Sequence, residues 1–179
     1  GKHVLMDLPQ PSALDTEQYE AWHRVTTDVN AVSVVEGTAG AGKTYTMNAI
    51  ARSYESRGYE VTGLALAWSA ALNLKDAAKL QDGRAIAGWL KDVEAGKIRL
   101  GPKSLLVVDE AGMVGVRDVH KILEVAKEYG AKVILLGDTR QQKAVAAGDP
   151  LRKIVQQNGS SRLDVIRRQV RPEDRDAVN

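Results

Sequence analysis

The sequence predicts an α/β fold in which a parallel sheet is covered by helices on both faces. Short apolar runs alternate along the chain with helix-like segments, an order that favours parallel strands joined by helical crossovers. Residues 104–108 and 131–136 are apolar almost without interruption, which is typical of strands buried on both faces. A glycine-rich stretch, Gly37–Thr44, lies between an apolar run and a helix-like segment, as in strand–loop–helix units.

The expected elements follow one another in a regular order. The predicted strands span residues 31–35, 59–67, 104–108, 131–136 and 163–166. The predicted helices span residues 15–30, 43–56, 69–79, 85–95, 116–129 and 150–157, and residues 81–83 are predicted to form a turn. Asp15 or Thr16 is expected to cap the first helix, and Gly58 and Gly130 to follow the ends of two others. Residues 1–13 contain two prolines and no periodicity, so they are interpreted as a leader or linker before a domain of residues 14–170.

The composition fits a single globular domain of 179 residues. A net charge of +2 neither requires nor excludes a nucleic-acid partner. The sequence contains no cysteine, so disulfides and thiolate-bound metals are excluded, and a cytoplasmic location is expected. No apolar run is long enough to span a membrane, and the first residues do not resemble a secretory signal. Because the chain does not begin with methionine, we expect a piece of a longer protein.

Gly37-x-x-x-x-Gly42-Lys43-Thr44 matches the complete phosphate-binding P-loop pattern. Backbone N–H groups of such a loop surround a phosphate, and the N-terminus of the next helix attracts the same anion. Lys43 is expected to reach the β- and γ-phosphates, and Thr44 to ligate Mg²⁺, so the predicted cofactors are ATP and Mg²⁺. The residues expected to hold the nucleotide here are Gly37, Thr38, Ala39, Gly40, Ala41, Gly42, Lys43 and Thr44. A mere glycine-rich turn would not explain the Lys-Thr pair.

Two carboxylates, Asp109 and Glu110, come directly after the apolar run 104–108. We assign Asp109 to the metal ion, since Mg²⁺ prefers oxygen ligands, and Glu110 to the attacking water as a general base. Taken alone, the pair could be an acidic strand end at the protein surface. An intact P-loop upstream favours the metal-binding interpretation.

Three further polar side chains are candidates for the same site. Gln141 follows the run 131–136, where an amide can sense a γ-phosphate and orient water. Arg168 follows the last predicted strand and could stabilise the charge of the transferring phosphate, although the sequence does not decide between it and Arg167. Gln18 precedes the P-loop strand, and its amide offers a donor and an acceptor to a purine edge. A solvated helix glutamine is an equally good interpretation of Gln18.

These motifs resemble those of RecD-like, superfamily-one DNA helicases, and most of all the helicase part of conjugative transfer relaxases of the Ti-plasmid TraA type. The matching stretches are Gln18, Gly37–Thr44, Asp109-Glu110-Ala111-Gly112-Met113, Gly137-Asp138-Thr139-Arg140-Gln141 and Ile166-Arg167-Arg168-Gln169. The resemblance implies the first RecA-like domain of a motor that acts on single-stranded DNA. It also implies an adenine-reading Gln18, with Gln141 and Arg168 at the γ-phosphate. Residues 171–179 would then begin a connection to a second RecA-like domain that this chain lacks.

The sequence departs from the family on the side that contacts DNA. Ala67-Trp68-Ser69 stands where the family has a Thr or Ser followed by a small or basic residue, and Ala85 replaces an expected second Thr. Trp68 could stack on a base or pack in the core, and Ser69 is the other candidate DNA contact. These changes leave open a second function, a DNA-binding or docking module that kept the fold without motor activity. A small-molecule kinase would need a substrate lid, and the sequence shows no such insertion.

Overall fold

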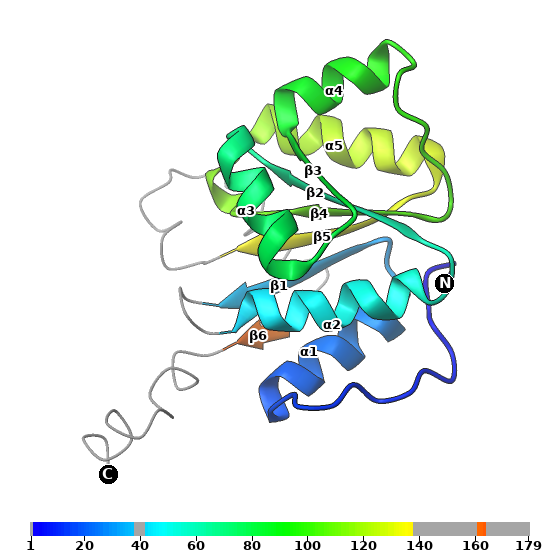
Figure 1. The fold of residues 1–179 in the computed structure, drawn as a ribbon. Helices are drawn as coiled ribbons and strands as arrows, with labels where there is room; N and C mark the ends of the chain where they lie inside the picture. The colour runs from blue at the N-terminus through cyan, green and yellow to red at the C-terminus, as the bar shows by residue number, and fades with distance from the viewer. Residues whose placement is uncertain (1, 38–41, 138–160, 164–179) are drawn as a thin grey trace, which may run out of the picture.

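A computed structural model describes residues 2–37, 42–137 and 161–163, which form a parallel sheet with helices on both faces (Figure 1). The strands are β1 Val32–Gly37, β2 Glu60–Ala65, β3 Asp82–Ala85, β4 Ser104–Val108, β5 Lys132–Gly137 and β6 Ser161–Leu163. The helices are α1 Thr16–Thr27, α2 Lys43–Glu55, α3 Trp68–Ala78, α4 Ile86–Glu94 and α5 Val116–Tyr129, with a short 3₁₀ turn, η1, at Ala111–Met113. The strand order is β3-β2-β4-β5-β1-β6, and every pair is parallel.

The central strands bury side chains on both faces, as their apolar sequences predict. Successive residues of β4 point to opposite sides, so Val107 packs with α1, α2 and α3, whereas Val108 packs with α4 and α5. Trp22 of α1 and Met47 of α2 are buried in the first layer, and Trp89 of α4 is buried in the second. The predicted fold class is therefore confirmed.

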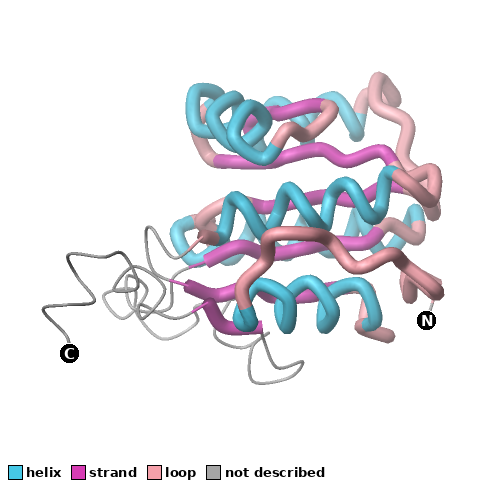
Figure 2. The backbone as a smooth tube through the Cα atoms, turned by 60° about the horizontal axis from the view of Figure 1, so that its bottom comes forward, coloured by secondary structure: helices cyan, strands magenta, loops and turns pink. Residues whose placement is uncertain are grey.

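The segment interpreted as a leader is partly anchored on the fold. The His3 ring is hydrogen-bonded through Nδ1 to the Tyr59 hydroxyl at 2.7 Å and through Nε2 to the Gly130 carbonyl at 2.9 Å. Leu5 is buried, and its N–H donates to the carbonyl of Thr26 at 2.8 Å. Figure 2 shows the following residues running across the layer formed by α1 and α2.

The prediction of a turn at residues 81–83 is wrong, because Asp82–Ala85 forms the edge strand β3 beside β2. Its sequence, Asp-Gly-Arg-Ala, lacks the apolar alternation that would identify a strand. Because Gly83 has no side chain, β3 can pack closely against the backbone of α3. A Cβ atom at this position would lie 2.5 Å from the carbonyl oxygen of Ala71 in α3.

Several predicted boundaries differ from the observed ones. Strand β1 runs to Gly37 and not to residue 35, and α3 begins at Trp68, one residue early. Strand β6 begins at Ser161 and includes the first residue of the predicted strand 163–166, whose other residues lie outside the described part of the chain. The predicted helix 150–157 lies outside the described residues. Asp15 caps α1 as expected, and Gly130 follows α5 with a φ of +74°.

A buried lysine lies at the amino end of β5, away from the P-loop edge. The Lys132 side chain is fully buried, and its Nζ donates to the Asn30 carbonyl at 2.8 Å and to Ser33 Oγ at 2.5 Å. The Ser33 hydroxyl donates in turn to Asp28 at 2.8 Å. Burial lowers the pKa of Lys132 from 10.5 to about 8, and the charge of Asp28 opposes that shift.

This pKa predicts a pH-dependent stability. Between pH 8 and 10 the unfolded chain holds the Lys132 proton and the folded chain releases it, so the free energy of unfolding should rise with pH, in total by about 3 kcal/mol. Tyr54 and Tyr59, whose pKa values burial raises, act in the opposite direction, and only near and above pH 10, where unfolded tyrosines ionise. Urea denaturation at pH 7.5 and 9.5 measures the rise. The variant Lys132→Met should lose it, and equal slopes for both proteins would contradict the assignment.

Candidate nucleotide-binding site

The P-loop and the acidic pair meet at one edge of the sheet. Because β1, β4 and β5 are parallel, their carboxyl ends point the same way (Figure 1). Gly37 ends β1 and Asp109 directly follows β4, while β5 lies between the two strands. Lys43 then begins α2, which returns from this edge. The topology thus brings together residues that are far apart in the sequence.

The start of α2 has the features of an anion site. Gly42 adopts a left-handed conformation, with φ of +86° and ψ of 18°, which glycine tolerates without strain. Among the described residues, no side chain caps this helix, so its first N–H groups have no side-chain acceptor in this part of the chain. Lys43 is half-buried and Thr44 is exposed. These are the positions that contact with phosphate and Mg²⁺ would require.

Asp109 is held by the backbone at the end of β4. Its N–H donates to the Leu64 carbonyl at 2.8 Å, and its Oδ1 accepts from the Glu110 N–H at 2.9 Å. Burial raises the pKa of Asp109, and the negative charge of Glu110 adds to the rise. The Glu110 N–H bond and the positive charge of Lys43 act in the opposite direction. Lys43 and Asp109 are therefore close enough to interact across the site.

The site offers few oxygen ligands of its own, and this fits Mg²⁺ bound together with phosphates. Within the described ranges, no group of three or more His, Cys, Asp or Glu side chains could hold a metal ion. Thr44 and Asp109 supply one hydroxyl and one carboxylate. Mg²⁺ typically takes one or two such groups and completes its shell with phosphate oxygens and water.

Glu110 has an unusual backbone conformation. Its φ of 46° and ψ of 49° lie in the left-handed region, and η1 starts at the next residue. A residue with a Cβ atom is strained there by about 1 kcal/mol. The Glu110 side chain is exposed, whereas Asp109 is partly buried.

The strain at Glu110 can be measured by substitution. Glu110→Gly should unfold with a free energy about 1 kcal/mol higher than that of Glu110→Ala, because glycine adopts a positive φ freely. Glu124 lies exposed in α5 and provides the control. There the order should reverse, since alanine favours a helix over glycine by about 1 kcal/mol. If alanine were also the better residue at position 110, the left-handed conformation would be disproved.

Gln18 is buried and links the start of α1 to the P-loop. Its Oε1 accepts from the Asp15 N–H at 3.1 Å, and its Nε2 donates to the Gly42 carbonyl at 3.4 Å. Asp15 Oδ1 accepts from the Gln18 N–H at 2.8 Å, which completes a capping box. The interpretation of Gln18 as a solvated helix residue is therefore wrong. The Asp-x-x-Gln spacing is the sequence signal that could have revealed the capping role.

Removal of the Gln18 amide should destabilise the domain. Gln18→Ala leaves the Asp15 N–H without its side-chain acceptor and should lower the free energy of unfolding by about 1 kcal/mol or more. Glu20→Ala, an exposed change on the same helix, should alter it by less than about 0.5 kcal/mol. Chemical denaturation compares the two variants. Equal stability would show that the hydrogen bonds of Gln18 contribute nothing.

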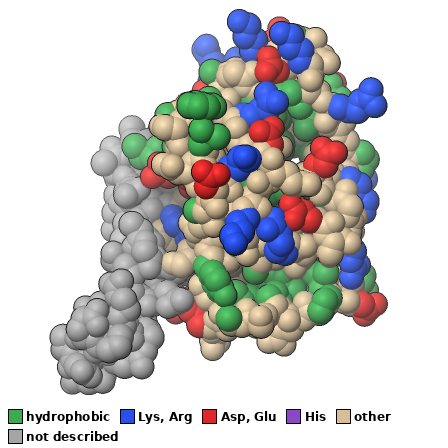
Figure 3. All heavy atoms as spheres, in the orientation of Figure 1, with side chains coloured by type: hydrophobic (Ala, Val, Ile, Leu, Met, Phe, Trp, Pro, Cys, Tyr) green, Lys and Arg blue, Asp and Glu red, His purple; other side chains and the backbone are tan. Residues whose placement is uncertain are grey.

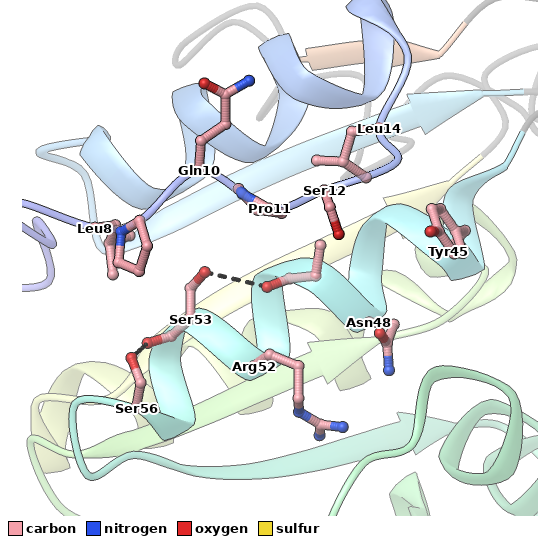
Figure 4. A pocket seen from close by; sticks show the side chains of 12 residues that line it. Leu8, Gln10, Pro11, Ser12, Leu14, Tyr45, Asn48, Arg52, Ser53 and Ser56 are labelled. Atoms are coloured by element: carbon pink, nitrogen blue, oxygen red, sulfur yellow. Dashed lines mark hydrogen bonds between the residues drawn. The ribbon is translucent and has the colours of Figure 1, made fainter.

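A groove beside the P-loop was not predicted. It has a volume of about 400 Å³ and lies between the N-terminal segment and α2. Tyr45, which directly follows Thr44 and is 48% exposed, lines the groove, as does Leu14 at the start of α1 (Figure 4). Hydrophobic side chains gather along this strip of the surface (Figure 3). The groove opens beside the helix end that carries Lys43.

The remaining predicted site residues fall into two groups. Thr38, Ala39, Gly40, Ala41, Gln141 and Arg168 lie outside the described residues. Trp68 and Ser69 are described and stand exposed at the start of α3, separated from the P-loop strand by β4 and β5. The Trp68 side chain is 65% exposed, so the interpretation of this residue as core packing is wrong.

A parallel sheet with a P-loop strand, an acidic strand end and this strand order defines a P-loop nucleotide-binding domain. A family model described as an AAA domain matches residues 13–179, and the chain belongs to that family. In the part of the chain that the structure describes, no helix is long and apolar enough to cross a membrane.

The chain is similar to segments of longer proteins that act in conjugation and DNA unwinding. It is 37% identical over 158 residues to the probable conjugal transfer protein TraA of Sinorhizobium fredii, a match that covers 88% of this chain and 14% of that protein. It is 29% identical to the multifunctional conjugation protein TraI of Escherichia coli K12, over 99% of this chain and 11% of the relative. It is also 32% identical to the ATP-dependent RecD2 DNA helicase of Deinococcus radiodurans, over 76% of this chain and 19% of the relative.

Solved structures show the same fold. The Hef helicase domain of Pyrococcus furiosus aligns with a TM-score of 0.54 at 19% identity, covering 80% of this chain and 36% of that one. The UvsW helicase of bacteriophage T4 aligns with a TM-score of 0.56 at 11% identity, covering 84% of this chain and 59% of that one. The RecA-like fold and the resemblance to RecD-like helicases and TraA-type conjugation proteins are thereby confirmed.

Proposed function

We propose that the chain is the first, ATP-binding motor domain of a DNA helicase, within a protein of the conjugative relaxase and helicase type. The observation that carries the proposal is the meeting of Lys43, the start of α2 and Asp109 at one edge of the sheet. A cation, a set of helix N–H groups and a half-buried carboxylate together suit the Mg²⁺ complex of a nucleoside triphosphate.

The roles of the residues follow from their positions. The α2 N-terminus and Lys43 would hold the phosphates, and Thr44 and Asp109 would hold Mg²⁺, which supplies positive charge to the phosphate oxygens. The raised pKa of Asp109 reflects burial and the charge of Glu110, and a bound cation would favour its ionised form. Glu110 is exposed and would accept a proton from the attacking water. Gln141 and Arg168 are proposed to act at the γ-phosphate.

The groove between α2 and the N-terminal segment is proposed to receive the nucleoside. Tyr45 offers an aromatic face next to Thr44, whereas Gln18 is buried against the Gly42 carbonyl and does not line the groove. An adenine contact by Gln18 would use the second N–H of its amide, because Gly42 already accepts one hydrogen bond from Nε2. The groove therefore offers an apolar strip and the Tyr45 ring to the nucleoside, and a contact with Gln18 would lie outside its walls.

Translocation along single-stranded DNA is proposed for the whole protein and not for this chain alone. The chain spans between 11% and 19% of the length of the relatives described above. Among the described residues proposed to hold the phosphates and Mg²⁺, Lys43 is the one cation, and a second RecA-like domain of the same protein is proposed to complete the site. Residues 171–179 are proposed to begin the connection to that domain, and the cytoplasm is the proposed location.

Binding of a fluorescent, non-hydrolysable ATP analogue tests the proposal. The chain should bind the analogue more tightly with Mg²⁺ than without it, and Lys43→Ala should raise the dissociation constant about tenfold or more. Lys121→Ala removes an exposed lysine of α5 and should leave binding unchanged. In the full-length protein, Lys43→Ala should also abolish DNA-stimulated ATP hydrolysis.

The same experiment separates the motor from its alternative. A chain that folds and fails to bind the analogue at either Mg²⁺ concentration would contradict the motor proposal. It would favour a docking or DNA-binding module that keeps the RecA-like fold. An unchanged turnover number in full-length Lys43→Ala would count against the motor in the same way.

A further inference from the structure

A second cleft lies at the edge of the sheet, next to β3. Its volume is about 350 Å³, at the lower end of the range for small-ligand pockets. The cleft is bounded by the start of α3, the strand β3 and the helix α4. The residues that line it are Trp68, Asp82, Gly83, Arg84, Ala85, Gly88, Trp89 and Asp92. Because β2 and β3 are parallel to β1, Trp68, which follows β2, and Ala85, which ends β3, lie on the edge that carries the P-loop.

The polar groups of this cleft favour a neutral ligand over a phosphate. Arg84 Nε lies 2.8 Å from Asp82 Oδ2, and Arg84 Nη1 lies 3.3 Å from Asp92 Oδ2. Two carboxylates thus share one guanidinium, so the charged side chains that line the cleft carry a net charge of −1 (one positive and two negative groups). A phosphate would be repelled, whereas a flat ligand with amino and carbonyl groups could hydrogen-bond to both kinds of side chain.

Two aromatic side chains line the same cleft. Trp68 is 65% exposed, the kind of open face on which a planar ring can stack. Trp89 is buried, and its indole Nε1 is the one buried side-chain polar atom in the described part of the chain that has no hydrogen-bond partner. A buried donor without an acceptor is rare in folded proteins. The cleft therefore offers the open face of Trp68 for stacking, and the buried Trp89 forms part of its wall.

The cleft is open on the side of α4. A Cβ atom built on Gly88 would meet nothing within 4 Å. Gly88 lies inside α4, where glycine is the less favourable residue, so a larger side chain could fill this space without disturbing the helix. The neighbouring Gly83, by contrast, packs against the α3 backbone and cannot be enlarged.

We propose that this cleft binds one unpaired nucleobase of a single-stranded nucleic acid. The Trp68 ring stacks on the base, and Arg84, Asp82 and Asp92 hydrogen-bond to its polar edge. The proposal rests on the proposed motor function, which places a strand along this edge of the sheet. In this proposal the strand is held by base stacking. Ala67 and Ala85 stand where the helicases that this sequence resembles are expected to carry hydroxyl side chains that contact DNA. Base–aromatic stacking suits a motor because every base has a π-face.

Oligonucleotide binding by the whole chain tests the site. The probes are an oligodeoxycytidylate of about 16 nucleotides and an abasic strand of the same length, both at low salt. Trp68→Ala and Gly88→Met should each raise the dissociation constant of the oligodeoxycytidylate about fivefold or more, and leave that of the abasic strand unchanged. Quenching of tryptophan fluorescence by the oligodeoxycytidylate should disappear in Trp68→Ala. Tyr129→Ala removes an exposed aromatic ring of α5 and should bind both probes like the parent chain.

The outcomes distinguish the base site from the nucleotide site. Wild-type affinity for oligodeoxycytidylate in both cleft variants overturns the base site, as does failure of the parent chain to prefer the base-containing strand. ATP-analogue binding is measured on the same samples and should be unchanged in both variants. If ATP binding is lost and the base-dependent binding persists, the motor proposal fails and the base site stands. Circular dichroism melting checks that each variant is folded, and Gly88→Met is expected to melt no lower than the parent chain.

Discussion

Parallel pairing of β1, β5 and β4 is the constraint on which the rest of the structure depends. Each strand is buried on both faces, so its backbone groups must bond to neighbouring strands and cannot turn to water. The register Val35↔Leu136 and Val107↔Ile134 then fixes how far each strand end protrudes. The pairing of the strands therefore places Gly37 and Asp109 at the same edge of the sheet, although the two residues are far apart in the sequence.

The sequence predicts the parts of the protein in which one physical signal dominates. Mostly apolar runs give the buried strands, and glycines with positive φ follow the helix ends at Gly58 and Gly130. The P-loop and the acidic pair are recognisable because their chemistry depends on neighbours in the sequence. Lys43 and Thr44 directly follow Gly42, and Glu110 directly follows Asp109. Because these residues are neighbours in the sequence, their spacing is enough to identify each motif.

Features that depend on distant neighbours could not be predicted in this way. The strand β3 is short and polar, and it forms because Gly83 lets the backbone approach α3. The exposure of Trp68 depends on where α3 begins, and the link between Gln18 and the P-loop depends on Gly42, 24 residues away. The buried Lys132 is compensated by carbonyl and hydroxyl groups near residue 30. In each case the deciding contact joins residues whose proximity only the folded chain creates.

The Gly42 carbonyl accepts three hydrogen bonds, from the Thr46 N–H and the Thr46 hydroxyl, each at 3.0 Å, and from the Gln18 amide. The two contacts with Thr46 lie within α2, whereas the contact with Gln18 reaches α1 and is the longest of the three. A small rotation of this peptide group would therefore change the link to α1 before it changed the helix itself. Binding equilibria are reciprocal. A ligand that fixes the Gly42 peptide group at the start of α2 would thus also stabilise the first turn of α1. A change that destabilises this turn would in return lower the affinity for that ligand.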